Sequence, residues 1–414
     1  MFTVLQSFTK PNSQLIMDIV SERLKKLSVS QTLAMSQKSK DLKAQGIDVI
    51  DLSVGEPDFN TPDHIKDAAK RAIDDNFTFY SPVPGFMDLR QAIAHKFKVE
   101  NDLTYAPEQI VVSNGAKQSL TNVILSMVNP GEEVIVLAPY WVSYLELVKV
   151  AEGTPVVINT TLENDFKVTL EQLRGAITPK SKLLILCSPS NPTGSIYSKQ
   201  ELHDIAVEVA KHPDLFVIAD EIYEHINFVG RHESIAQFDF IYERVITING
   251  VSKGFAMTGW RIGYMAASKE IVQACIKLQG QTTSGASSIA QKAAFAALTI
   301  PSTFPATMNA AFKRRRDLVY SYMSKIDGVK VNLPEGAFYI FPDISSFFGR
   351  RYGDKKIQSA QDITLYLLEV AHIALVPGCA FGEPNCIRIS YATSDEVLVV
   401  AMERFTMALK ALTS

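Results

Sequence analysis

The sequence predicts an α/β protein whose core is a mostly parallel sheet covered by helices on both faces. Between Ile110 and about Ala267, short runs of Val, Ile and Leu alternate with longer stretches of helical period. These runs are apolar throughout, which is typical of strands buried on both faces. With 414 residues, the chain is also long enough for two or three domains. Sheets of this kind carry their chemistry in the loops beyond the carboxyl ends of the strands.

Six apolar runs are the expected strands of this sheet. They are Ile110–Val112, Val134–Leu137, Leu183–Leu186, Leu215–Ile218, Val245–Ile248 and Gly263–Ala266. All but the last are followed by a segment that contains Gly, Pro, Asn or Asp, and these segments are where functional side chains are expected.

The last hundred residues read as a smaller α+β domain. Thr307–Lys325 has the apolar stripe of one long amphipathic helix that leads out of the core. Short strands are expected after it at Val329–Val331, Ala337–Phe341, Ala374–Val376 and Ile387–Ile389, and a final helix at Ser394–Leu412. Two helical stretches, Gln14–Leu27 and Leu33–Gln45, show no strand signal and are expected to pack beside this domain. The expected division is 1–50, 51–305 and 306–414.

Composition excludes several classes of function. The 41 Lys and Arg residues nearly balance the 44 Asp and Glu residues, and no basic block exists that could follow a nucleic-acid backbone. The four cysteines form no CxxC pair, which argues against structural zinc and favours a reducing compartment. The first residues given lack the basic and apolar regions expected of a signal peptide, and no run of ~20 apolar residues occurs. We therefore expect a cytoplasmic protein that binds neither nucleic acid nor membrane.

Lys253 and Asp220 are the strongest candidates for chemistry. Lys253 follows the run Val245–Ile248 among small and apolar neighbours, where desolvation could make it a free amine and a Schiff-base nucleophile. Asp220 ends another expected strand, where an anion could keep the ring nitrogen of a pyridinium cofactor protonated, and Tyr223 could donate to the oxygen of that ring. Taken singly, each has a plain alternative: a solvated lysine, a helix-capping aspartate and a half-buried tyrosine.

Further candidates follow the other expected strands. Asn191 lies in an Asn-Pro-Thr-Gly turn, and Ser113–Gln118 opens a helical stretch whose free N–H groups suit a phosphate. Trp141 could stack on a flat cofactor, Arg261 could bind a phosphate and Arg388 could bind a carboxylate. A turn, a packed indole and surface arginines are the alternatives.

Four ordered motifs carry a resemblance to a known family. They are Asn-Pro-Thr-Gly from Asn191, Asp-Glu-x-Tyr from Asp220, Ser-Lys-x-Phe-x-Met-x-Gly-x-Arg-x-Gly from Ser252, and Arg-Ile-Ser-Tyr-Ala from Arg388. In this order and at these separations, the chain resembles the class I/II aminotransferases, which are fold type I pyridoxal-phosphate enzymes, from about Leu52 to Leu412. The resemblance implies a large cofactor-binding domain with a mostly parallel seven-stranded sheet between helices, and a smaller α+β domain made from both chain ends.

The resemblance also implies roles for individual residues. Lys253 would form the internal aldimine with pyridoxal 5'-phosphate and carry the proton of the 1,3-transfer. Asp220 would pair with the pyridinium nitrogen, Tyr223 and Asn191 with the ring oxygen, and Trp141 would stack on the ring. No metal is expected.

The remaining implied roles concern the phosphate, the substrate and a second subunit. Gly115, Ala116, Lys117, Ser252 and Arg261 would surround the phosphate. Tyr80 matches a tyrosine that the neighbouring subunit contributes, which implies a homodimer with shared sites. The substrate-binding residues would be Arg388 on the α-carboxylate, Gly55 closing over it, and Lys117, Trp141 and Asn191 nearby.

The segments Leu52–Phe59, Gly115–Lys117 and Pro139–Tyr144 most resemble the prokaryotic-type (subgroup Ib) aspartate aminotransferases. There the lysine after the phosphate-binding turn, here Lys117, meets the distal carboxylate of the substrate. This implies ping-pong transamination between aspartate and 2-oxoglutarate. Relatives that use prephenate tend to carry Lys-Pro-Ser-x-Thr near the first helix, whereas residues 28–32 read Ser-Val-Ser-Gln-Thr, which argues against prephenate.

Other functions remain open at this point. One alternative is an aromatic or alanine aminotransferase, or a carbon–sulfur lyase, on the same scaffold. Another is an aminotransferase-like ligand-sensing module, although only about 50 residues precede the first motif, too few for an upstream DNA-binding region. The spacing of Glu221 and His225 also suits a metal, but the seven histidines are otherwise scattered and a surface position is expected for His225.

Overall fold

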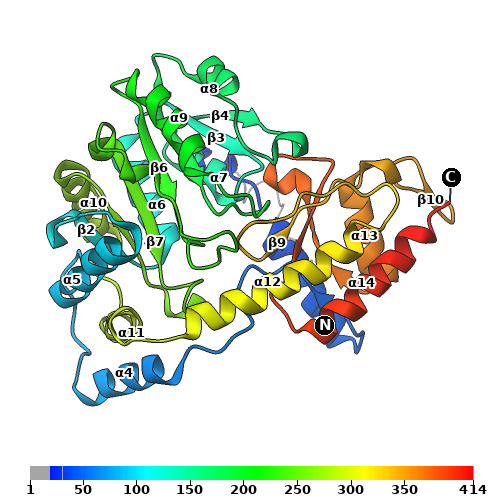
Figure 1. Ribbon diagram of the computed structural model, residues 1–414, viewed down its shortest axis with the longest axis horizontal. Helices are drawn as coiled ribbons and strands as arrows, with labels where there is room; N and C mark the ends of the chain where they lie inside the picture. Colours follow the sequence, from blue (N-terminus) through cyan, green and yellow to red (C-terminus); the bar gives the residue numbers. More distant parts are fainter. Residues whose placement is uncertain (1–18, 30, 414) are drawn as a thin grey trace, which may run out of the picture.

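The computed structural model describes residues 19–29 and 31–413 and is built around one seven-stranded sheet (Figure 1). The strand order is β2-β8-β7-β6-β5-β3-β4. The strands are β2 (Ile110–Ser113), β3 (Glu133–Ala138), β4 (Thr154–Asn159), β5 (Ser181–Cys187), β6 (Phe216–Asp220), β7 (Val245–Gly250) and β8 (Gly263–Ala266). All pairs from β7 to β4 are parallel, and the two pairs that β8 makes, with β7 and with β2, are antiparallel. The predicted α/β fold with a mostly parallel sheet is confirmed.

The apolar runs predict six of these strands and miss β4. This strand lies at the sheet edge, pairs only with β3 and leaves Val157 39% exposed. It also contains Pro155, which lacks the N–H that a central strand would donate to a neighbour. An edge strand therefore need not be continuously apolar, and the sequence signal is weaker.

Helices cover both faces of the sheet, as alternate strand residues show. Val134 and Val136 lie in one hydrophobic core, while Ile135 lies in the core on the opposite face. The first core includes side chains of α6 (Ala116–Met127), α7 (Ser143–Val150) and α10 (Lys269–Thr282). The second includes side chains of α4 (Asp63–Asp74), α5 (Met87–Lys96), α8 (Leu170–Ala176), α9 (Lys199–Ala210) and α11 (Ser288–Thr299).

A separate core lies beside the large sheet and is formed mainly by the C-terminal part of the chain. Helices α12 (Phe304–Met323), α13 (Ala360–Val370) and α14 (Asp395–Lys410) contribute to it, with an antiparallel sheet of β13 (Val376–Pro377), β14 (Ile387–Ser390) and β9 (Tyr339–Ile340). Strand β1 (Ile50–Asp51) pairs in parallel with β12 (Ile373–Ala374), and β10 (Arg351–Tyr352) pairs with β11 (Lys355–Lys356). In Figure 1, α12 runs from the large sheet to this second core.

The N-terminal part of the described chain packs with this second core. It contains α2 (Glu22–Lys25) and α3 (Gln31–Ala44), and Met35 of α3 packs with Leu368 and Ala374. Short helical turns complete the described secondary structure: Phe97–Asn101, Pro107–Gln109, Leu162–Asn164, Ile235–Gln237, Tyr242–Arg244, Thr258–Trp260, Ser345–Phe347 and Gly378–Phe381. Within the residues given above, no helix is long and apolar enough to cross a bilayer.

Two sequence-based expectations need correction. The run Val329–Val331 is not a strand, because it makes only an isolated bridge between Lys330 and Asp343 and has no neighbour to extend it. The helix expected at Gln14–Leu27 lies partly outside the described residues, and the described part holds only the single turn of α2. The long helix expected at Thr307–Lys325 is confirmed as α12, three residues earlier at its start. The division into 1–50, 51–305 and 306–414 stays a prediction.

A buried ion pair joins α5 to the segment after β6. The ammonium group of Lys96 bonds to the carboxylate of Glu224, which also accepts a 2.9 Å bond from Asn101. Burial alone would raise the pKa of Glu224, but the charges of Lys96 and of the nearby histidines lower it to about 2. Glu224 is therefore ionised at neutral pH and depends on Lys96.

We predict that Lys96→Ala lowers the stability of the protein by ~3–5 kcal/mol, because it leaves a buried carboxylate without its partner. Urea unfolding followed by circular dichroism measures the change. The matched control is Lys98→Ala, which breaks an exposed pair with Asp102 (3.1 Å) and should cost less than ~1 kcal/mol. Equal losses in the two variants would contradict the prediction.

Candidate active site

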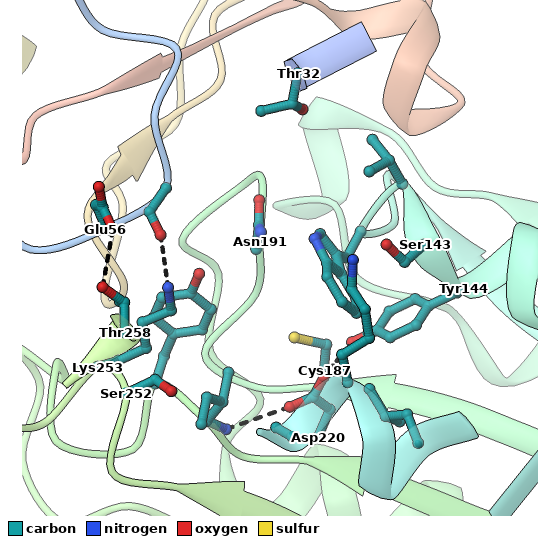
Figure 2. Close-up of a pocket in the computed structure, with 18 of the residues that line it drawn as sticks. Thr32, Glu56, Ser143, Tyr144, Cys187, Asn191, Asp220, Ser252, Lys253 and Thr258 are labelled. Carbon is teal, nitrogen blue, oxygen red and sulfur yellow. Dashed lines mark hydrogen bonds between the residues drawn. The ribbon is translucent and has the colours of Figure 1, made fainter. Parts of the chain in front are cut away.

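A cavity of about 530 Å³ opens at the carboxyl ends of β5 and β6 and beside the loop after β7 (Figure 2). Parallel pairing brings these strand ends together, since Cys187 of β5 lies opposite Asp220 of β6. Of the residues that the sequence assigns to a site, all line this cavity except Gly115 and Tyr80: Gly55, Ala116, Lys117, Trp141, Asn191, Asp220, Tyr223, Ser252, Lys253, Arg261 and Arg388.

Burial changes the ionisation of the two central groups. Burial lowers the pKa of Lys253 to about 8, and its Nζ donates a 2.5 Å hydrogen bond to the carbonyl oxygen of Gly55. Burial raises the pKa of Asp220 to about 6, even though Tyr144 donates a 2.6 Å hydrogen bond to its Oδ2 atom. The cavity therefore holds an amine that loses its proton close to neutral pH and a carboxylate that is still mostly ionised there.

One end of the cavity is positively charged. Helix α6 begins at Ala116, so its N-terminus and partial positive charge face this end. Arg261 donates to two backbone carbonyl oxygens nearby, and burial together with the charge of Arg261 lowers the pKa of Lys117. In the described part of the chain, no carboxylate lies within 4.0 Å of either side chain. This arrangement favours an anionic ligand.

Gly115 explains how Arg261 approaches the helix. Its φ is +83°, and a Cβ atom at this position would collide with the guanidinium group of Arg261. Gly115 therefore does not line the cavity itself, but it makes room for a residue that does.

Trp141 and Lys117 form the wall above the strand ends. The Nζ atom of Lys117 lies 4.9 Å from the centroid of the Trp141 ring. The indole also packs edge-on against Tyr144, with ring centroids 5.5 Å apart. A flat apolar surface with a cation at its rim thus faces the cavity.

Arg388 lies buried at the opposite side, on β14 of the small sheet. Its Nη2 donates to the carbonyl oxygen of Ser53 at 2.7 Å and its Nη1 donates to Oδ1 of Asn191 at 3.1 Å, while Nε has no hydrogen-bond partner. The guanidinium packs over the ring of Tyr339, 4.5 Å from its centroid. Among the residues that the structure describes, no acid pairs with it. A buried cation of this kind is stabilised when a ligand supplies the anion.

The sequence analysis missed several lining residues, and three of them make polar contacts in the cavity. Tyr339 shares a 2.9 Å hydrogen bond between hydroxyl groups with Tyr223, Tyr144 bonds to Asp220, and Glu56 accepts a 2.8 Å hydrogen bond from Thr258. Tyr339 lies in an expected strand and Tyr144 in an expected helical stretch. The sequence pattern does not indicate in which direction either side chain points. Only tertiary contacts reveal them.

Tyr80 lies outside the cavity on the surface. Its side chain is 97% exposed and that of Phe79 is 81% exposed. The segment around them borders a second cavity with residues 285–289, at the start of α11. Two adjacent, almost fully exposed aromatic residues are unusual for a surface that contacts only water.

The structure does not bring Glu221 and His225 together as metal ligands. His225 bonds to Glu100 (2.9 Å) and packs edge-on against Phe255, and 20% of its side chain is exposed. Glu221 instead lies 3.3 Å from His232. The two residues belong to different clusters because the segment after β6 turns between them.

Comparisons with known proteins identify the family of the chain. Residues 47–405 match the family described as Aminotransferase class I and II. The chain is 48% identical over 395 residues to the bifunctional aspartate aminotransferase and glutamate/aspartate-prephenate aminotransferase of Petunia hybrida, covering 94% of this chain and 82% of that protein.

Two solved structures are similar over nearly the whole chain. The aspartate aminotransferase of Rhizobium meliloti has a TM-score of 0.92 and 41% identity, covering 95% of this chain and 99% of the other. The aspartate aminotransferase of Thermus thermophilus with maleate has a TM-score of 0.89 and 40% identity, covering 94% and 99%. With a matching family over most of its length and relatives of this similarity, the chain belongs to the class I and II aminotransferases.

Proposed function

We propose that this aminotransferase uses pyridoxal phosphate to move an amino group between aspartate and 2-oxoglutarate. The observation that carries the proposal is the cavity itself, in which a buried lysine of lowered pKa and a buried carboxylate lie between two cationic regions that no acid among the described residues neutralises. A cofactor with one phosphate and a dicarboxylic substrate would supply the missing anions.

The residues present fit pyridoxal phosphate. Its phosphate suits the α6 N-terminus with Gly115, Ala116, Lys117, Ser252 and Arg261, and its ring nitrogen suits Asp220. Its ring oxygen suits Tyr223 and Asn191, and Trp141 offers a flat face. When bound, this group supplies an aldehyde that condenses with amines and a ring that withdraws electrons from the α-carbon of an amino acid.

Lys253 is the proposed proton carrier and the attachment point for the cofactor. Because burial lowers its pKa to about 8, an appreciable fraction is the neutral amine near neutral pH, the form that can attack an aldehyde or accept a proton. Its hydrogen bond to the Gly55 carbonyl oxygen fixes the amine beside Tyr223, whose ring centroid lies 5.9 Å from Nζ. The lysine is thus both held and desolvated.

Arg388 and Lys117 are the proposed substrate clamps. Arg388 would hold the α-carboxylate, with Gly55 close by and Asn191 fixing the guanidinium. Lys117, at the Trp141 rim, would meet the distal carboxylate. Two fixed charges on opposite sides of the cavity would orient a dicarboxylic amino acid with its α-carbon toward Lys253.

The comparisons support the choice of substrate. The Petunia relative is named for aspartate, glutamate and prephenate, and the Thermus structure is described with maleate, a dicarboxylate. Relatives that use prephenate tend to carry a Lys-Pro pair where this chain has Ser28 and Val29. We therefore propose that aspartate rather than prephenate is its substrate. Purified protein assayed with aspartate, phenylalanine, alanine and cystathionine as donors and with 2-oxoglutarate or prephenate as acceptors tests this against the other activities of the fold.

We further propose a homodimer with shared sites. The exposed Phe79 and Tyr80 support an interface, and Tyr80 would reach the phosphate of the partner's site. A cytoplasmic location is proposed from the small number of cysteines, all free in the structure.

The first prediction concerns cofactor attachment. Purified protein should be yellow, and borohydride should fix the cofactor to the peptide that carries Lys253, because reduction of the imine makes the bond permanent. Mass spectrometry of the digest locates the label. Lys253→Ala should take up no label. A label on another lysine, or a colourless protein that added cofactor does not change, would refute the assignment.

The second prediction concerns the interface. Tyr80→Ala and Lys253→Ala should each be nearly inactive, but mixing them under conditions of subunit exchange should restore activity, because each hybrid dimer holds one site intact at both positions. Mass spectrometry of intact dimers verifies the exchange. No recovery despite proven exchange would count against shared sites.

The third prediction concerns Lys117. Lys117→Ala should lower kcat/KM roughly tenfold or more for aspartate and glutamate but little for alanine or phenylalanine, because only the dicarboxylic substrates lose a charge-assisted contact worth ~1–3 kcal/mol. Steady-state kinetics on the four donors measures this, with Lys269→Ala, an exposed lysine at the start of α10, as the control. Equal losses on all four donors with weaker cofactor affinity would assign the lysine to the phosphate instead.

A further inference from the structure

Tyr144 is a buried residue at the bottom of the cavity that none of the roles above uses. It is the second residue of α7, its side chain is 2% exposed, and its hydroxyl group donates a 2.6 Å hydrogen bond to Oδ2 of Asp220. In Figure 2 its ring points from the helix toward Asp220, with Cys187 beside it. The edge-on contact with Trp141 fixes the ring from the other side.

The direction of this hydrogen bond is defined by the ionisation of its partners. Burial and the charge of Asp220 raise the pKa of Tyr144 well above its usual value, so the phenol keeps its proton. Burial also raises the pKa of the Cys187 thiol to about 12, and its Sγ atom lies 3.4 Å from the carbonyl oxygen of Pro189 as a donor. Tyr144 is therefore a permanent donor, and Asp220 is its acceptor.

Few other groups favour the ionised form of Asp220. The backbone N–H of Ile222 lies at 3.4 Å from Oδ1, a weak contact. The charge of Lys253 also favours ionisation, whereas burial and the charge of Glu221 oppose it. Among the described residues, Tyr144 is the one side chain that donates a hydrogen bond to this carboxylate.

We propose that Tyr144 is a positioning residue that keeps Asp220 deprotonated and turned toward the cavity, ready to pair with the ring nitrogen of the cofactor. The role in pairing rests on the proposed function, but the coupling between the two side chains does not. A carboxyl group that took up a proton here would no longer hold a protonated ring nitrogen, and the site would lose its means of withdrawing electrons from the substrate. Tyr144 thus acts through Asp220 and not on the substrate.

The direct test titrates Asp220 in cofactor-free protein. Carboxyl ¹³C NMR of aspartate-labelled protein, with Asp220→Asn to assign the signal, should give a pKa of about 6. Tyr144→Phe should raise it by ~1–2 pH units, because a charge-assisted hydrogen bond to the ionised form is lost. The matched control is Tyr366→Phe, which removes another buried tyrosine hydroxyl group, bonded to the Ala408 carbonyl oxygen at 2.8 Å, and should leave the signal unchanged.

A second, isosteric substitution keeps the test independent of folding. Fluorotyrosine at position 144 has a more acidic phenol and is a stronger donor, so it should lower the pKa of Asp220, opposite to Tyr144→Phe. An unchanged Asp220 signal in either variant overturns the proposal.

The pH dependence of activity in the cofactor-bound enzyme is the complementary measurement. The acidic limb of the kcat/KM profile of Tyr144→Phe should move upward by about one pH unit or more, so that most of the activity lost at pH 6–7 returns near pH 9. In an Asp220→Asn background, Tyr144→Phe should have no further effect. A loss that is the same at every pH would show a merely structural role. A shifted Asp220 signal in a protein without transaminase activity would instead overturn the proposed function and leave the coupling intact.

Discussion

The site depends on the parallel register of β5, β6 and β7. Cys187 lies opposite Asp220, and Asp220 lies opposite Ile248, so the three chains leave the sheet at one edge. The segment after β5 carries Asn191, β6 ends in Asp220, and the loop after β7 carries Lys253. Since parallel strands need long crossover connections, Asn191, Asp220 and Lys253, each about 30 positions from the next in the sequence, line one cavity only because the sheet exists.

Burying charges at this edge is unfavourable unless something compensates for it. Burial shifts the pKa values of Asp220, Lys253 and Arg388 toward their neutral forms, and no acid among the described residues pairs with Arg388. By contrast, Lys96 and Glu224, just behind β6, neutralise each other within the chain. In the cavity, the compensating charges instead have to come from ligands. Shifted pKa values of this kind are typical of functional sites.

The cavity also lies between two hydrophobic cores. Asp220, Lys253 and the α6 N-terminus lie at the edge of the large sheet, whereas Arg388 and Tyr339 lie in strands of the small sheet. Gly55 comes from the segment after β1, which pairs with β12, and its carbonyl oxygen meets Lys253 across the cavity. A ligand bound to both sides would therefore hold the two parts of the molecule together. The distance between Arg388 and Lys117 would then depend on how the two cores pack against each other.

The α/β class, six of the seven central strands and 11 of the 23 residues that line the cavity follow from the sequence, because apolar runs and strand-end motifs are local signals. The sequence missed β4, since an edge strand need not be continuously apolar, and it predicted a strand at Val329–Val331 where no partner strand exists. The pairing of Tyr144 with Asp220, that of Tyr339 with Tyr223, and the burial of Arg388 were decided only by the tertiary structure. Each is a contact between distant segments, whose geometry follows from packing and not from local composition.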